Sequence, residues 1–307
     1  MKKISFLALL LLPCLFIGFY SCDKKTKSQE EDTINKGKAI ILVDETLLPV
    51  IEDQVAVFES QHNASITLIG KSESEIVQQL SKNKQQLAIL SRELTKNEAE
   101  IFDNKKIIVK ATPLATDAIA FISHKNNNDT LIDLNKVITF IQGKNQSDFK
   151  GLVFDNPNSS TVRYIKELAK VNALPKDKIF SFETNNEVIE FVSKNKGMIG
   201  VVGVNWLFQP SPKMQEVVDN VKLLSVKSLK GNTYVKPTQD NIAAGLYPMT
   251  REIKMLNYQP YPGLGMGFAS FVSGDIGQRI ILKSGLVPVK IPNRNIIIRN
   301  QINNNKK

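Results

Sequence analysis

Apolar and polar residues follow two alternating periodicities from about residue 39 onwards. Residues 39–43 are a short apolar run typical of a buried strand, and Leu48, Ile51 and Val55 follow at the spacing of one helical face within residues 46–60. The same order of strand, turn and helix recurs through most of the chain, which predicts an α/β protein with mostly parallel sheets. Further strands are expected at residues 65–69, 87–90, 107–109, 118–122, 152–154 and 197–204, and further helices at 72–80, 133–141 and 267–284 and from residues 95, 159 and 184.

The first residues form an apolar segment of a different kind. A short basic start precedes an apolar run over residues 4–20, which has the length of a signal peptide and is short for a membrane span. The run ends at Ser21-Cys22, where a small residue directly precedes a cysteine, as in bacterial lipoprotein cleavage sites. We therefore expect a signal peptide over residues 1–21 and an exported protein that carries acyl chains such as palmitate on Cys22. An uncleaved anchor with an incidental thiol is the alternative.

Polar segments flank the expected core. Residues 22–38 have no apolar periodicity and are interpreted as a flexible tether, and residues 294–307 form an Asn- and Lys-rich tail. Cys14 lies in the apolar run, so the mature chain would hold a single cysteine and no internal disulfide.

Composition limits the chemistry. The 307 residues include only two His and two Cys, which disfavours zinc sites and His-dependent catalysis, so neither an enzyme nor a cofactor is expected. The formal charge of +10 favours anionic partners, but no long basic block occurs, and nucleic acid is the weakest of the candidate partners. Glycines 263, 265 and 267 have the wrong spacing for a dinucleotide turn and are interpreted as a flexible approach to a helix that begins near Phe268.

Hydroxyl side chains recur where an expected strand gives way to a helix. Thr46, Ser72 with Ser74, and the run Ser159-Ser160-Thr161 occupy three such junctions. A helix start offers unpaired N–H groups and a partial positive charge, so several of them directed at one crevice could enclose an oxyanion. Each hydroxyl alone is also an ordinary N-cap. The triple run exceeds what capping needs and is followed by Arg163, so it is the best evidence for a ligand.

Residues 154–163 resemble the phosphate-contacting Ser-Gly-Thr loop of PstS-type phosphate-binding proteins, the receptor subunits of bacterial ABC importers. The resemblance extends over nearly the whole mature chain. The other matching segments are Thr46-Leu47, Ser72-Glu73-Ser74, residues 90–94, residues 113–120, residues 247–251 and residues 277–288.

The resemblance implies a type II periplasmic-binding-protein fold, in which two α/β lobes are joined by a two-strand hinge and close around the anion. We expect lobe I to comprise residues 39–116 and 247–293, and lobe II residues 117–246. The implied protein is a monomer in the periplasm, anchored through its lipid, that captures inorganic phosphate and passes it to the membrane subunits of an ABC permease.

The implied ligand set departs from the family pattern at two positions. Leu87 stands where the family has a proton-accepting aspartate, and Asp155 stands where it has an arginine. Asp155 or Asp44 could replace the acceptor, and Arg92 and Arg163 could supply the positive charge or be paired at the surface. The expected phosphate-binding residues are Thr46, Leu47, Ser72, Ser74, Arg92, Asp155, Ser159, Ser160, Thr161 and Arg163.

Three other functions stay open. The site could prefer sulfate or molybdate, because its acceptors decide which oxyanion fits. The departures at Leu87 and Asp155 also suit an envelope interaction lipoprotein that keeps the scaffold without binding a small anion. A phosphate-ester hydrolase is disfavoured, since the sequence shows neither an activated nucleophile nor a metal-ligand cluster.

Overall fold

The computed structural model describes residues 32–82, 87–104, 106–144 and 150–291. The expected signal peptide, Cys22, most of the tether and the polar tail at 294–307 lie outside the described residues. The described residues from Thr33 to Ile291 belong to one compact unit. Among the helices in the described ranges, none is both long and apolar enough to cross a membrane.

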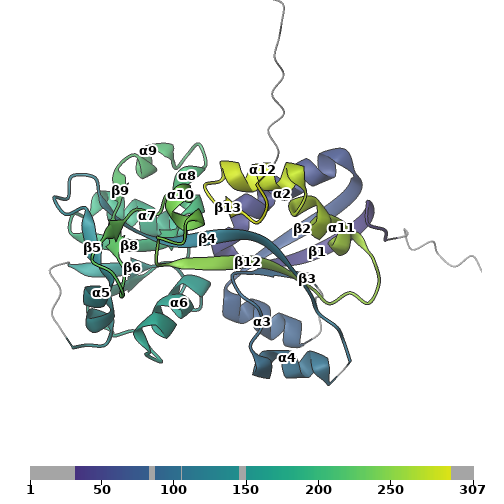
Figure 1. Cartoon of the computed structure of the whole chain (residues 1–307), viewed down its shortest axis with the longest axis horizontal. Helices are drawn as coiled ribbons and strands as arrows, with labels where there is room; N and C mark the ends of the chain where they lie inside the picture. Colours follow the sequence, from purple (N-terminus) through teal and green to yellow (C-terminus); the bar gives the residue numbers. More distant parts are fainter. Residues whose placement is uncertain (1–31, 83–86, 105, 145–149, 292–307) are drawn as a thin grey trace, which may run out of the picture. The chain divides into compact units, whose positions relative to one another are not determined.

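A ten-stranded mixed sheet forms the centre of this unit (Figure 1). Its order is β2-β1-β3-β12-β4-β8-β6-β7, and β13 and β9 pair with β4. A second sheet has the order β11-β10-β5. The strands are β1 (Lys36–Asp44), β2 (Asn63–Lys71), β3 (Leu87–Leu90), β4 (Lys110–His124), β5 (Leu131–Asp133), β6 (Gly151–Phe154), β7 (Ile179–Ser181), β8 (Met198–Gly203), β9 (Val221–Leu223), β10 (Ser225–Lys227), β11 (Tyr234–Val235), β12 (Thr250–Asn257) and β13 (Val287–Pro288).

Two groups of parallel strands flank an antiparallel centre. Strand β1 pairs in parallel with β2 and β3, and these three strands are the first half-sheet. Strand β6 pairs in parallel with β7 and β8, and these are the second half-sheet. Strand β12 pairs antiparallel with β3 and β4, and β4 continues into an antiparallel pairing with β8. Strands β4 and β12 therefore lie between the half-sheets, and their antiparallel pairing corrects the expectation of mostly parallel sheets.

Helices cover both faces of each half-sheet. In the second half-sheet, Leu152 and Phe154 belong to the apolar cluster that includes α6, whereas Val153 packs with residues of α7, as the alternation of side chains along a strand requires. Helices α2 and α11 pack with β1 in one cluster, and α3 and α4 pack in another. The helices are η1 (Glu45–Leu47), α2 (Leu48–Gln61), α3 (Glu73–Ser81), α4 (Lys96–Asp103), α5 (Leu134–Ile141), α6 (Ser160–Ala169), α7 (Asn185–Lys194), α8 (Asn205–Phe208), α9 (Gln215–Val218), α10 (Gln239–Ala243), α11 (Leu264–Val272) and α12 (Asp275–Lys283).

Some local predictions are wrong. The single helix expected over 267–284 is divided into α11 and α12, with Gly274 as the N-cap of the second. The glycine run at 263–267 is not a flexible approach, because α11 begins inside it and a Cβ on Gly267 would lie 1.7 Å from the carbonyl oxygen of Ile34. Residues 107–109 precede β4 rather than forming a strand, and β1 begins at Lys36, before the expected start of the fold.

The predicted lobe boundaries fall close to the two central strands. The boundary at 116/117 lies within β4, and the boundary at 246/247 lies shortly before β12. The division of the chain into two lobes stays a prediction.

Candidate functional site

Two hydroxyls from opposite half-sheets meet inside the protein. Thr46 lies in η1, directly after β1, and Ser160 is the first residue of α6, which follows β6. Their hydroxyl oxygens are 3.2 Å apart, and neither residue is exposed to solvent. Since β1 and β6 belong to different half-sheets, this contact joins the two at the carboxyl ends of their strands, where open α/β sheets commonly bind ligands.

A single buried arginine contacts both hydroxyls. The guanidinium of Arg251, on β12, donates through Nη1 to the hydroxyl of Ser160 at 2.7 Å and through Nη2 to that of Thr46 at 3.1 Å. Its Nε donates to Asp117 Oδ2 at 2.8 Å, a contact that the register dictates because the two residues face each other on β12 and β4. Arg251 is 5% exposed. With Asp44, these residues are called the Arg251 cluster.

The carboxylates of the Arg251 cluster have spare acceptor capacity. Asp44 Oδ1 accepts from the backbone N–H of Thr46 at 3.1 Å and from its hydroxyl at 2.9 Å. Within the described ranges, Asp44 Oδ2 and Asp117 Oδ1 are buried without a hydrogen-bond partner. Burial raises the pKa of both carboxyls, although Arg251 opposes the rise. Burial acts against the charge of Arg251, but Asp117 and Asp44 hold its pKa above the usual value.

Residues that follow the second half-sheet also hold the backbone of Thr46. The Thr46 carbonyl oxygen accepts from Asn205 Nδ2 at 3.2 Å and from Trp206 Nε1 at 2.9 Å. Both donors follow β8, so Thr46 is held by residues of the opposite half-sheet on its backbone as well as on its side chain.

Asp155 lies directly after β6 and joins the start of α6 to that of α7. Its Oδ1 accepts from the Ser159 hydroxyl at 2.6 Å and its Oδ2 from Asn185 Nδ2 at 3.1 Å. The pKa of Asp155 is raised to about 7, chiefly by burial; the hydrogen bond from Ser159 opposes the rise and the nearby Asp44 contributes to it. Ser159 also caps α6 by accepting from the N–H of Val162, whereas the Thr161 hydroxyl is buried with no partner among the described residues.

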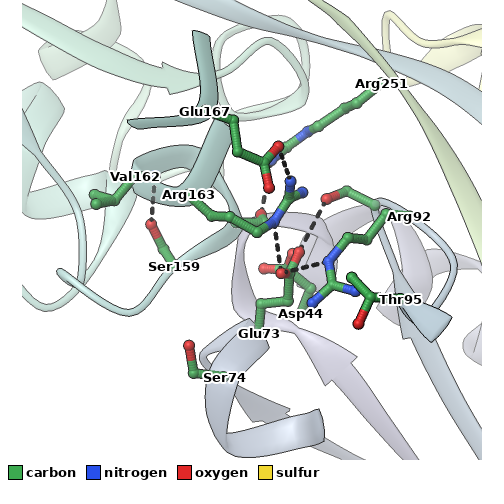
Figure 2. Close-up of polar contacts among 12 residues, drawn as sticks. Asp44, Glu73, Ser74, Arg92, Thr95, Ser159, Val162, Arg163, Glu167 and Arg251 are labelled. Atoms are coloured by element: carbon green, nitrogen blue, oxygen red, sulfur yellow. Dashed lines mark hydrogen bonds and ion pairs between the residues drawn. The ribbon is translucent and has the colours of Figure 1, made fainter. Parts of the chain in front are cut away.

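Arg92 and Arg163 are bound to carboxylates and do not contact the Arg251 cluster. Their Nε atoms both donate to Oε1 of Glu73, at 2.8 and 2.6 Å (Figure 2). Arg92 also binds Glu98 at 2.7 and 3.0 Å, and Arg163 binds Glu167 at 2.7 Å. These five residues are called the Glu73 cluster, and they match the alternative that both arginines are paired.

Other predicted site residues also lie elsewhere. The Ser72 hydroxyl donates to Glu75 Oε2 at 2.8 Å, and Ser74 donates to the carbonyl oxygen of Asn158 at 3.3 Å. Leu47 is part of the apolar core. Leu87 pairs with Asn257, six positions along β12 from Arg251, or roughly 20 Å of strand. Leu87 therefore lies away from the Arg251 cluster and belongs to the apolar core. Its equivalence to the family's aspartate stays a prediction.

The prediction missed Arg251 as the central cation and Asp117 as its partner. A signal was present, because Arg251 alternates with Ile253 and Met255, which places a charge on the buried side of an otherwise apolar strand. In the parts of the chain that the structure describes, no group of three or more His, Cys, Asp or Glu residues could hold a metal ion.

Comparison with known proteins identifies the family. The family model described as a PBP superfamily domain matches residues 28–275. The chain belongs to the PBP superfamily. No curated protein matches the chain in a sequence comparison.

Solved structures show the same fold. One of them is a Clostridium perfringens protein described as a phosphate ABC transporter substrate-binding protein and solved with bound phosphate. It is 21% identical to this chain, with a TM-score of 0.67, and the match covers 83% of this chain and 100% of that one. An ABC-type phosphate transport receptor from Vibrio cholerae is 18% identical with a TM-score of 0.62, over 82% and 100%. The CcmR regulatory domain of Synechocystis, in complex with 2-PG, is 12% identical with a TM-score of 0.52, over 77% and 96%.

These matches confirm the predicted α/β fold of periplasmic binding proteins and the resemblance to PstS-type proteins. They establish the fold of this chain and not its ligand, because a regulatory domain shares the same fold with transport receptors. The Arg251 cluster, and not the fold, therefore bears on the ligand.

Proposed function

We propose that this PBP-superfamily protein is the solute-binding component of an ABC importer and captures inorganic phosphate between its two half-sheets. One observation carries the proposal: hydroxyls of Thr46 and Ser160, from opposite half-sheets, both bind the buried guanidinium of Arg251. Anchoring through lipid on Cys22, a monomeric state, delivery to permease subunits in the cell envelope and binding without chemistry are parts of the same proposal.

We expect the oxyanion to enter between the two hydroxyls and the arginine, which contact one another directly in the structure. It would replace the contact between Thr46 and Ser160 and accept hydrogen bonds from Nη1 and Nη2 of Arg251, from the Ser160 hydroxyl, and from the Thr46 hydroxyl once that group turns away from Asp44 Oδ1. The first N–H groups of α6 have no partner within the helix and carry its positive partial charge, so they add donors next to Ser160. Charge-assisted hydrogen bonds in a site without water are the strong kind, which suits tight capture.

The acceptors favour a protonated oxyanion. Near pH 7 phosphate carries at least one proton, which can be donated to a carboxylate, whereas sulfate carries none. Asp44 Oδ2 and Asp117 Oδ1 are buried acceptors without a partner in the described ranges. These oxygens would accept a hydrogen bond from the protonated oxygen of phosphate, and their negative charge would repel sulfate. Phosphate is therefore the proposed ligand, and sulfate should bind more weakly.

A second function has one observation in its favour. Arg251 already donates to Asp117, Ser160 and Thr46, so the Arg251 cluster could act as a structural joint. In an envelope lipoprotein that interacts with other proteins and binds no small anion, the Arg251 cluster would only hold the two half-sheets together.

Calorimetry on the full chain distinguishes these functions. Phosphate and sulfate are titrated separately between pH 5 and 8, together with melting curves. We expect phosphate to bind with a dissociation constant of about 10 µM or lower and to raise the melting temperature, with sulfate at least about tenfold weaker. The absence of heat and of a melting shift with about 1 mM phosphate would reject phosphate capture and favour the structural joint.

A further inference from the structure

Glu73 is shared by two arginines from opposite half-sheets. Its Oε1 accepts from Nε of Arg92, which follows β3, at 2.8 Å and from Nε of Arg163, on α6, at 2.6 Å (Figure 2). The Glu73 side chain is 3% exposed, and those of Arg92 and Arg163 are 19% and 22% exposed. The Glu73–Arg163 pair therefore joins α3, packed on the first half-sheet, to α6, packed on the second.

Each side of this junction has a second partner of its own. Arg163 also binds Glu167 one turn further along α6, and Glu73 also binds Arg92 on its own half-sheet. Unpairing a buried charge is strongly unfavourable, but separation of α3 from α6 would leave both groups paired. The junction can therefore break and re-form without leaving a buried charge alone.

A second contact lies beside it. Ser74 donates from its backbone N–H at 3.4 Å and from its hydroxyl at 3.3 Å to the carbonyl oxygen of Asn158, in the loop before α6. Arg163 is three residues after Ser160, so the two side chains lie on one face of α6. A movement of α6 that breaks the Glu73–Arg163 pair would thus also withdraw Ser160 from Thr46.

We propose that the Glu73–Arg163 pair is a clasp that holds the two half-sheets together and keeps Ser160, on α6, next to the half-sheet that carries Thr46. It raises the fraction of protein in the closed, binding-competent arrangement without touching the anion, and an affinity measured for phosphate rises with that fraction. The clasp itself is independent of the ligand, whereas its effect on affinity rests on the proposed function.

The test compares Arg163→Met, which removes the clasp, with Glu167→Gln, which removes only the partner within α6. Without phosphate, hydrogen exchange of the Ser74 amide reports the opening of the junction. We expect Arg163→Met to accelerate this exchange about tenfold and Glu167→Gln to leave it unchanged. With phosphate, Arg163→Met should weaken the measured affinity about tenfold, because a smaller fraction of the protein is competent to bind.

A second variant guards against misfolding. If Arg163→Met lowers the melting temperature far more than Glu167→Gln does, Glu73→Gln is measured in its place, because it keeps the shape of the side chain and leaves Arg92 paired with Glu98. Unchanged Ser74 exchange in both clasp variants would overturn the clasp, even if the unaltered protein binds phosphate. Faster exchange in a protein that does not bind phosphate would support the clasp and reject the proposed function.

Discussion

The Arg251 cluster and the Glu73 cluster join the same two half-sheets at the start of α6, but they differ in what they leave unsatisfied. In the Glu73 cluster each arginine binds two carboxylates, and the arginine side chains remain 19% and 22% exposed. The Arg251 cluster is almost entirely shielded from water, and Asp44 and Asp117 each keep a buried oxygen without a partner among the described residues.

This difference separates a candidate site from a structural contact. A buried acceptor without a partner is unfavourable, so its presence suggests a group that completes it. Matched and partly exposed ion pairs need no such explanation and contribute modestly to stability. Positive charge alone is therefore a poor guide to an anion site, since two of the three arginines in these clusters serve carboxylates instead.

The largest expected effect on phosphate affinity comes from Arg251→Lys, which is compared with the same substitution in the Glu73 cluster. Arg251→Lys keeps the charge, but an ammonium cannot bind Asp117 and both hydroxyls in the planar geometry of a guanidinium. We expect phosphate affinity to fall about 100-fold, measured by calorimetry. Arg92→Lys is the matched control and should change affinity less than about threefold. Equal effects of the two substitutions would erase the distinction between the clusters.

Removal of one hydroxyl should have a smaller effect. Ser160→Ala deletes an acceptor for Arg251 and a proposed donor to the anion, so phosphate affinity should fall about tenfold. Ser60→Ala is the control, because that hydroxyl donates to the carbonyl oxygen of Val57 within α2. Competition binding with radiolabelled phosphate measures both variants, and an unchanged affinity in Ser160→Ala would argue against an anion at this position.

Asp155 should make stability depend on pH. Its pKa is about 7 in the folded protein and about 4 when unfolded, so the folded state binds more protons between these values. Stability therefore falls as pH rises from about 4 to 7 and is level above that, a contribution of at most about 4 kcal/mol. Asp155→Asn should make this slope shallower in urea denaturation at pH 5, 6, 7 and 8, and the raised pKa values of Asp44 and Asp117 leave the remainder.

A control with the opposite shift sharpens this prediction. The pKa of Asp133 is lowered, because hydrogen bonds from Lys227 and from the N–H of Asn135 outweigh partial burial. Asp133→Asn should therefore cost a constant amount of stability over the same pH range. If the two variants showed identical pH profiles, Asp155 would not retain its proton in the folded protein.

The smallest expected effect on binding is at Ser72, a predicted ligand that the structure assigns to a cap. Its hydroxyl and its N–H both donate to Glu75. Ser72→Ala should lower the free energy of unfolding by about 1 kcal/mol and leave phosphate affinity within about twofold. If Ser72→Ala lowered phosphate affinity as far as Ser160→Ala does, Ser72 would have to contact the anion.

Features encoded by neighbouring residues were predictable from the sequence. The capping boxes at Ser72 and Thr95 are present, and strand β3 has the predicted bounds. The break between α11 and α12 was missed, because apolar residues continue on both sides of Gly274 and hide the end of the first helix.

Pairing across the fold was not predictable in the same way. Whether Arg92 is free depends on Glu73, 19 residues away on another element, and the partner of Arg251 depends on the register of β12 against β4. Ser160 was predicted within its hydroxyl run, but its contact with Thr46 spans 114 residues. Local patterns identify which residues start a helix, and only the fold decides which of them meet.

The most direct test is a crystal structure of the full chain grown with phosphate. The account predicts a tetrahedral anion between Thr46, Ser160 and Arg251, hydrogen-bonded to both hydroxyls and to the guanidinium, with the two hydroxyl oxygens moved beyond their present 3.2 Å separation. A structure that retains the 3.2 Å contact and shows no anion beside Arg251 would contradict it.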